Sequence, residues 1–183
     1  MLDSLITSKT RIKLLLKFFL NSETKAYLRG LAEELGESTN AVRVELNRLT
    51  KAGLLQISSD GRTKLYRANT EHTLFPELNS LVRKYLGIDQ VVDNVLVQLG
   101  TVELAFITGD YARGIDSGII DLIIVGKIEN HEFLQHLVDK AEEVIKRKIR
   151  VLVLNKEELA RLKEKLKVDK ALVVWTNRTN ENN

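Results

Sequence analysis

The strongest constraint on the fold is a pair of short amphipathic segments separated by a few polar residues. In residues 27–35 apolar side chains recur at helical spacing, and Gly36 ends the pattern. The second segment begins at an N-cap of Ser38 or Thr39 and keeps an inward apolar stripe as far as Gly53. Two short helices joined by a tight polar turn are therefore predicted, which is a helix-turn-helix.

A further helix and a hairpin flank this pair. Ser8 is a suitable N-cap for a helix over residues 9–20, in which apolar positions share one side and lysines another. After the pair, β-prone runs at residues 54–58 and 63–68 flank an Asp-Gly step, which is a strong turn signal. The predicted order is three helices followed by a hairpin that forms a wing.

The string LRGLAEELGESTNAVRVELNRLTKAGLL within this region carries a specific resemblance. It resembles the winged-helix repressors of the ArsR and MarR type over about 60 residues, most closely at residues 49–55, which in that family lead into the wing. The resemblance implies a transcription regulator whose partner is double-stranded DNA. It also implies a homodimer built from the first helix and the helix after the wing, although an intradomain core is an alternative use for those apolar stripes.

The outward side of the second helix carries groups that hydrogen-bond to bases or phosphates. Arginine donates two hydrogen bonds to guanine and asparagine pairs with adenine, so Arg43 is the first candidate for base reading. A carboxylate at Glu45 would repel phosphate unless it pairs with Arg48 or turns sideways. A solvated helix face that contacts another protein is the alternative. The predicted DNA-binding residues are Arg29, Ser38, Thr39, Asn40, Arg43, Asn47 and Lys51, with Arg62 and Lys64 on the wing.

Charge separates the two halves of the chain. Residues 1–70 carry twelve Lys or Arg and seven Asp or Glu, whereas the remaining residues carry sixteen and eighteen. A polyanion therefore meets the N-terminal half first. The absence of cysteine excludes disulfide frameworks, thiolate zinc sites and cysteine nucleophiles. We expect a cytoplasmic protein with no membrane partner, because apolar runs are short and the first one lacks a cleavage site.

The predicted fold class is α+β, with four parts. Residues 1–70 are the winged helix-turn-helix domain, residues 71–100 a helical linker or dimerisation segment, residues 101–176 an α/β domain and residues 177–183 a disordered tail. The α/β assignment rests on short apolar runs that alternate with helical patterns. One of those helices has a capping pair, Asn155 with Glu158.

Two segments of the second half carry another resemblance. Residues 106–114 read FITGDYARG and residues 117–126 read SGIIDLIIVG. They resemble the nucleotidyltransferase fold of small stand-alone transferase domains, over about 75 residues that extend past the strand at Arg150. In that family a Gly-Ser turn holds the nucleotide triphosphate. Two aspartates two apart on one strand share metal ions with a third carboxylate on a neighbouring strand, and that spacing puts both on one strand face.

This sequence departs from that pattern at three positions. The turn serine corresponds to Asp110, the first strand aspartate to Ile119 and the third carboxylate to about Arg150, so that Asp121 alone remains. A lone carboxylate does not organise two divalent ions. We therefore expect no catalytic residue, no metal, no cofactor and no enzyme activity. The alternative is that Asp116 supplies a second carboxylate from a rearranged loop.

If the second half has lost its chemistry, the resemblance implies that it keeps a pocket and senses a small-molecule or nucleotide effector. Its predicted residues are Gly109, Asp110, Arg113, Gly114 and Asp121. A tight turn in a domain that supports dimerisation explains the same glycines equally well. The rival function is an active metal-dependent nucleotidyltransferase that the winged helix directs to its target.

Overall fold

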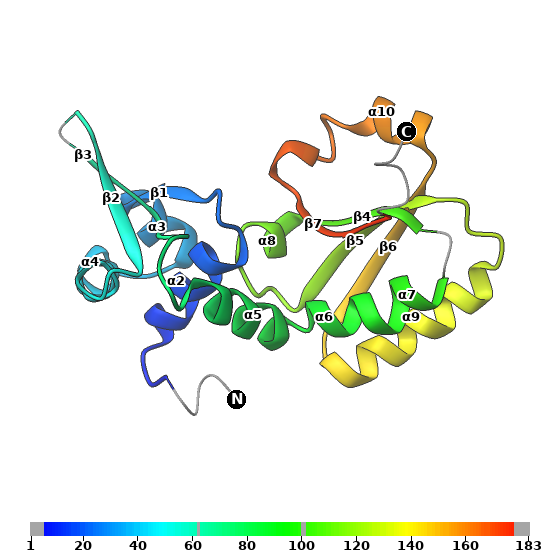
Figure 1. Cartoon of the computed structure of the whole chain (residues 1–183), viewed down its shortest axis with the longest axis horizontal. Coiled ribbons are helices and arrows are strands. Elements are labelled where there is room, and N and C mark those ends of the chain that lie inside the picture. Colours follow the sequence, from blue (N-terminus) through cyan, green and yellow to red (C-terminus); the bar gives the residue numbers. More distant parts are fainter. Residues whose placement is uncertain (1–5, 62, 100–101, 178–183) are drawn as a thin grey trace. The chain divides into compact units, whose positions relative to one another are not determined.

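The computed structural model describes residues 6–61, 63–99 and 102–177 and shows a mixed α+β protein with two sheets (Figure 1). The chain divides into two compact units, Met1–Tyr85 and Leu86–Asn183. Each is described by itself below as unit 1 and unit 2. Within the described ranges, no helix combines the length and the apolar character needed to cross a membrane.

Unit 1 consists of helices and one small antiparallel sheet of order β1-β3-β2. The predicted helices and hairpin are confirmed with small shifts at their ends. Strand β1 was not expected, and it places Tyr27 in extended backbone before the helix rather than inside it. The elements are α2 (Lys9–Leu20), β1 (Lys25–Tyr27), α3 (Leu28–Leu35), α4 (Thr39–Lys51), β2 (Leu55–Asp60), β3 (Thr63–Ala68) and α5 (Phe75–Leu86).

Local capping explains where the helices of unit 1 begin and end. The Ser8 hydroxyl accepts a hydrogen bond from the Arg11 N–H at 3.2 Å, and the Ser38 hydroxyl accepts one from the Ala41 N–H at 3.1 Å. Gly36 ends α3 in the left-handed conformation, with φ 63°. The connection from α3 to α4 is therefore short and fixed at both ends.

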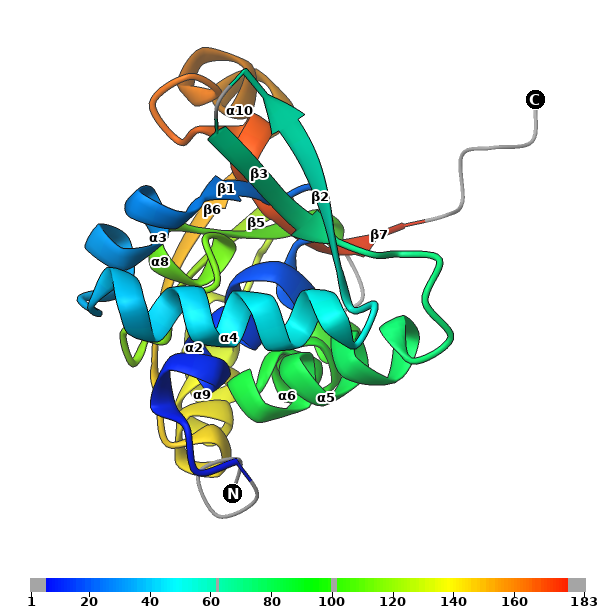
Figure 2. The ribbon, with the colours of Figure 1, turned by 90° about the vertical axis from the view of Figure 1, so that its left-hand side faces the viewer.

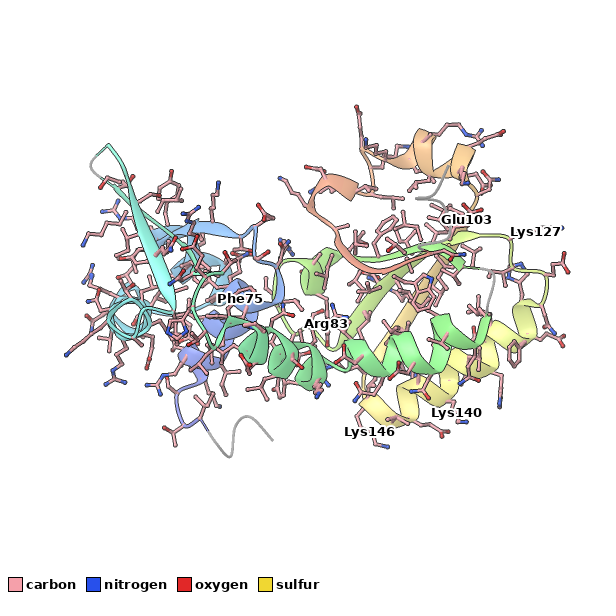
Figure 3. The ribbon with its side chains drawn as sticks, viewed as in Figure 1. Phe75, Arg83, Glu103, Lys127, Lys140 and Lys146 are labelled. Atoms are coloured by element: carbon pink, nitrogen blue, oxygen red, sulfur yellow. The ribbon has the colours of Figure 1, made fainter. Side chains whose placement is uncertain are left out.

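Helix α2 lies at the centre of the unit 1 core. Leu14, Phe18 and Phe19 are fully buried. Helix α5 contacts the same helix through Phe75, which is labelled in Figure 3. The Phe19 and Phe75 rings lie 5.7 Å apart between centroids, and Asn79 donates its side-chain amide to the Phe19 carbonyl at 2.6 Å. The first part of the predicted linker, residues 71–100, is thus integral to unit 1.

Unit 2 is a four-stranded sheet of order β6-β5-β4-β7 with helices on both faces (Figure 1). Strands β5 and β6 are parallel and are joined through α9, a crossover of the kind that a parallel pair needs, and the other pairs are antiparallel. The elements are α6 (Ile88–Val91), the π-helical turn η1 (Val92–Leu96), α7 (Val97–Leu99), β4 (Val102–Thr108), α8 (Gly109–Ala112), β5 (Ile119–Gly126), α9 (His131–Ile145), β6 (Lys148–Leu154), α10 (Lys156–Leu162), the 3-10 turn η2 (Val168–Lys170) and β7 (Leu172–Thr176).

Burial in unit 2 shows what covers each face of this sheet. Helices α6 and α9, with η1, pack together on one face. On the other face a core of Phe106, Ile123, Val125 and Leu154 is covered by residues from α10 and the segment after it. The strand side chains alternate between these two cores.

The apolar residues of α2 and of α6 with η1 are buried within the chain itself, whereas Leu78 and Leu81 of α5 are only partly buried. The homodimer built from α2 and the helix after the wing stays a prediction. One predicted boundary is corrected. The tail predicted at residues 177–183 begins too early, because the Asn177 N–H donates to the Glu103 carbonyl at 2.8 Å. Residues 178–183 lie outside the described residues.

Candidate functional site

The outward side of α4 is the first candidate surface of unit 1. Val42, Leu46 and Leu49 turn inward and are buried, which leaves the opposite side of the helix open (Figure 2). We call this open side the α4 face. Its members are all exposed: Thr39, Asn40, Arg43, Val44, Asn47, Arg48 and Lys51.

Glu45 does not belong to this face, although it lies in the middle of the same helix. Its side chain turns inward and is 5% exposed. Arg11 donates to it from α2 at 2.8 Å, Ser8 donates at 2.8 Å, and Arg48 approaches at 3.4 Å. Burial alone raises the pKa of Glu45, but these hydrogen bonds and the Arg11 charge bring it below its ordinary value. The carboxylate is therefore neutralised away from the α4 face.

Two lysines of α2 also form ion pairs within unit 1. Lys13 donates to the Leu35 carbonyl at 2.8 Å and to the Glu37 carboxylate at 2.7 Å, which holds the connection between α3 and α4. Lys17, which is nearly buried, donates to Glu34 at 2.8 Å. These cations stabilise the unit internally. Exposed cations of unit 1 remain on α4, α3 and the hairpin, and also at Lys9, Lys25 and Lys84.

The remaining predicted DNA-binding residues have different surroundings. Arg29 on α3 and Lys64 on β3 are exposed. Ser38 is exposed as well, but its hydroxyl is already engaged as the N-cap of α4. Arg62 lies outside the described residues. At the base of the hairpin, Arg67 donates to Gln56 at 3.2 Å.

The second candidate site lies in unit 2, at Asp121 on β5. Strand register places Arg150 of β6 directly across from Asp121, and the arginine donates to both carboxylate oxygens, at 2.6 and 2.9 Å. A bidentate pair of this kind is geometrically specific. Arg150 therefore neutralises Asp121, the carboxylate that the sequence resemblance singles out.

Gly109 shows how tightly Asp121 is enclosed. Gly109 begins α8 with φ 69°, and a Cβ there would lie 2.6 Å from the Asp121 Oδ2. A side chain at this position would collide with the carboxylate and strain the backbone. Glycine is therefore the residue that fits this turn beside Asp121.

The residues of this site do not fit the metal ions that the transferase resemblance implies. Ile119, two positions before Asp121, is aliphatic, and Asp110 pairs with Arg113. Across the part of the chain that the structure describes, no three His, Asp or Glu side chains gather as metal ligands. We therefore derive no metal-dependent step at this site.

Asp116, the alternative source of a second carboxylate, is engaged elsewhere. Arg147 donates to it at 2.7 and 3.1 Å, and the fully buried Tyr111 donates its hydroxyl. Burial raises the pKa of Asp116, but hydrogen bonds from Arg147 and Tyr111 bring it below its ordinary value. Burial and the neighbouring carboxylate raise the pKa of Tyr111. This cluster fixes the loop between α8 and β5.

A cavity of about 480 Å³ lies beside Asp121. Three of the five predicted pocket residues line it, namely Gly109, Arg113 and Asp121. The other two do not: Asp110 is paired with Arg113, and the Gly114 N–H closes a turn on the Tyr111 carbonyl. The rest of the lining is Thr108, Ala112, Lys165, Leu166, Lys167, Lys170 and Ala171.

A larger hollow of about 680 Å³ lies at the other end of the sheet, beyond β5 and β6. Glu103 and Lys127, labelled in Figure 3, are among its lining residues. Lys156 pairs with Glu103 at 2.7 Å, and the N-terminus of α10 is satisfied by its own capping box of Asn155 and Glu158. Glu103, Lys156 and Glu158 thus have internal partners.

Comparison with known proteins gives little help with these sites. No protein-family model and no curated protein matches the chain. Among solved structures, the chain is similar to a crystal structure of a mutant of the toxin-antitoxin MntA-HpeT. Sequence identity is 9%, the TM-score is 0.41, and the match covers 51% of this chain and 77% of that chain. A likeness of this extent carries no argument, so the sites are interpreted from their own geometry.

Sequence reasoning missed several residues of these two sites. Val44 and Arg48 belong to the α4 face, and their helical spacing from Asn40 and Lys51 was a sufficient signal. Lys165, Lys167 and Lys170 line the cavity as well, but no sequence pattern near them predicts this. The segment after α10 folds back beside β5, which is distant in sequence.

Proposed function

We propose that this protein is a sequence-specific DNA-binding regulator, in which unit 1 is a winged helix-turn-helix and α4 is the recognition helix. One observation carries the proposal. The α4 face is open along its length and combines amides and cations, while the one carboxylate within the helix, Glu45, is turned away and paired. A helix with such a side suits the major groove, which is wide enough to admit it.

Base reading falls to the middle of the α4 face. Asn40 and Asn47 lie opposite the buried stripe, and Arg43 lies between them in sequence, one turn from each. Arginine recognises guanine and asparagine recognises adenine by paired hydrogen bonds. Each good contact of this type contributes about 1–3 kcal/mol of discrimination.

Phosphate contacts are assigned to residues around the rim. Lys51 at the end of α4, Arg29 on α3 and Lys64 on β3 are exposed cations. Such contacts fix the position of a protein on the duplex and add affinity without sequence information. Lys13 and Lys17 are paired internally and are not assigned to DNA.

We propose that unit 2 resembles the nucleotidyltransferase fold without its chemistry. The support is the Asp121–Arg150 pair and the aliphatic Ile119, which leave one neutralised carboxylate where metal catalysis needs several. Magnesium-dependent transfer of a labelled nucleotide by the whole protein, lost in Asp121→Asn, would favour the rival transferase function instead.

Selection of bound duplexes from a random pool tests the DNA-binding proposal. We expect enrichment of one motif, and a palindromic motif would indicate that two copies bind as a twofold dimer. Arg43→Ala should lower affinity for the selected duplex by about five- to 150-fold, with little change for random duplexes.

Two further variants separate base reading from charge. Lys64→Ala should weaken all duplexes alike and reduce the salt slope by about one. Lys84→Ala removes an exposed cation of α5, away from the α4 face, and should change neither affinity nor salt slope. The proposal fails if no duplex binds at low salt, or if Arg43→Ala weakens every sequence equally.

A further inference from the structure

The cavity beside Asp121 has a strongly cationic lining. Lys165, Lys167 and Lys170 line it together with a single carboxylate, Asp121. Arg113 also lines it but is paired with Asp110. The three lysines are exposed and form no ion pair with any residue that the structure describes. Their charges are consequently available to a ligand.

Asp121 does not cancel this charge. Its carboxylate is held at both oxygens by Arg150, which is not among the lining residues. The effective charge of the cavity wall is therefore set by the lysines. An anion that approaches Asp121 meets an ion pair rather than a bare carboxylate.

The lysines stand on a segment that the fold holds in place. Leu166, Val168 and Ala171 pack on the core around Phe106, so side chains next to the lysines anchor the backbone. Lys167 itself adopts a left-handed conformation, with φ 50°, which is uncommon for a residue with a side chain. The Lys170 N–H closes the turn on the Lys167 carbonyl at 2.9 Å. Strain of this kind persists where the surrounding structure overdetermines it, as at ligand sites.

We infer that this cavity binds a small oligophosphate anion without a divalent metal ion. Its volume, about 480 Å³, lies in the range of small-molecule sites. Lysine ammonium groups bind phosphate as point charges, and several around one cavity suit a ligand with several phosphates. The arginine that excludes metal ions also makes the cavity wall compatible with an anion. The inference does not depend on DNA binding by unit 1.

Titration of the full-length protein with sodium tripolyphosphate in EDTA tests the inference. We expect saturable binding that is unchanged when EDTA is replaced by magnesium. The double variant Lys167→Gln/Lys170→Gln should weaken binding by about tenfold or more. Lys140→Gln/Lys163→Gln removes the same charge from exposed residues outside the cavity and should have little effect.

Asp121→Asn provides the sharpest contrast with a metal site. The inference predicts equal or tighter tripolyphosphate binding, because a negative charge is removed from the cavity wall. Loss of binding in Asp121→Asn together with a need for magnesium would overturn it, as would equal losses in the two double-lysine variants.

A separate arm identifies the source of the phosphate. If the cavity takes a small molecule, Lys167→Gln/Lys170→Gln should bind duplex DNA as well as the unchanged protein does. The small-molecule site is overturned if the unchanged protein does not bind tripolyphosphate and the double variant loses affinity for duplex DNA. That result would assign these lysines to contacts with a nucleic-acid backbone.

Discussion

Each unit contains a carboxylate held by an arginine from a neighbouring element, and the two pairs have opposite consequences. In unit 1, Arg11 draws Glu45 into the interior, so that the α4 face keeps its positive charge. In unit 2, Arg150 lies over Asp121 in a solvated position, so that a carboxylate suited to metal binding is neutralised. The two pairs therefore set the charge of the surfaces around them.

The largest expected effect comes from reversing the pairing in unit 2. Ile119 and Asp121 are two apart on β5, and Arg150 is directly across from Asp121. Ile119→Asp/Arg150→Asp would place three carboxylates on one sheet face. We expect this variant to bind Mn²⁺ measurably by water-proton relaxation, whereas the unchanged protein does not.

The matched control for that variant is Ile119→Asn/Arg150→Asn, which changes the same positions without adding charge. It should remain without Mn²⁺ binding. Equal Mn²⁺ affinity in the unchanged protein would contradict the account of unit 2, because it would mean that Arg150 does not prevent metal binding.

The next effect is on the stability of unit 1. Glu45→Ala leaves Arg11 and Ser8 without their partner, and we expect a loss of about 1–3 kcal/mol in urea unfolding. The value is below that of a fully buried pair because the Arg11 side chain is 33% exposed. Glu33→Ala, at an exposed position of α3, is the control and should change stability by less than about 0.5 kcal/mol. A Glu45→Ala value as small as the control would show that the pair does not hold α4.

The same pair predicts how unit 1 responds to acid. The pKa of Glu45 is lowered by its hydrogen bonds, and that of Glu37 by Lys13, so both carboxylates bind protons less readily when folded. Their contribution to stability is present above the ordinary glutamate pKa of about 4.3 and is lost as pH falls through the folded values. Glu45→Gln should therefore flatten the fall in stability below about pH 4.

The comparison also shows how far sequence alone reaches. Local signals predicted the caps at Ser8 and Asn155 and narrowed that of α4 to Ser38 or Thr39, because each cap depends on residues within one turn. The transferase resemblance predicted that the position of its third carboxylate corresponds to about Arg150. It did not show that Arg150 holds Asp121 at both oxygens, since that contact depends on the register between two strands.

The orientation of Glu45 shows the corresponding limit in unit 1. Helical spacing left it on the edge between the inward and outward sides of α4. Its burial depends on Arg11, 34 residues away in sequence, and no local pattern encodes that contact. The cavity lysines were missed for the same physical reason, because long-range packing of the segment after α10 positions them.

The smallest expected effect concerns an apolar side chain of the α4 face. Val44 is 41% exposed among amides and cations, and an aliphatic group there suits the methyl group of thymine. Val44→Ala should weaken binding to a selected duplex by about three- to tenfold. Replacing the contacted thymine with uracil should weaken the unchanged protein by a similar factor and leave Val44→Ala unaffected. If the losses of affinity from Val44→Ala and from the uracil replacement add up independently, this contact is ruled out.

The most direct test of the α4 face is photo-cross-linking to the selected duplex. A benzophenone amino acid placed at Asn47 should cross-link to DNA, whereas the same group at Glu77, an exposed position of α5, should not. Cross-linking at Glu77 with none at Asn47 would contradict the account, because DNA would then lie on a different surface of unit 1.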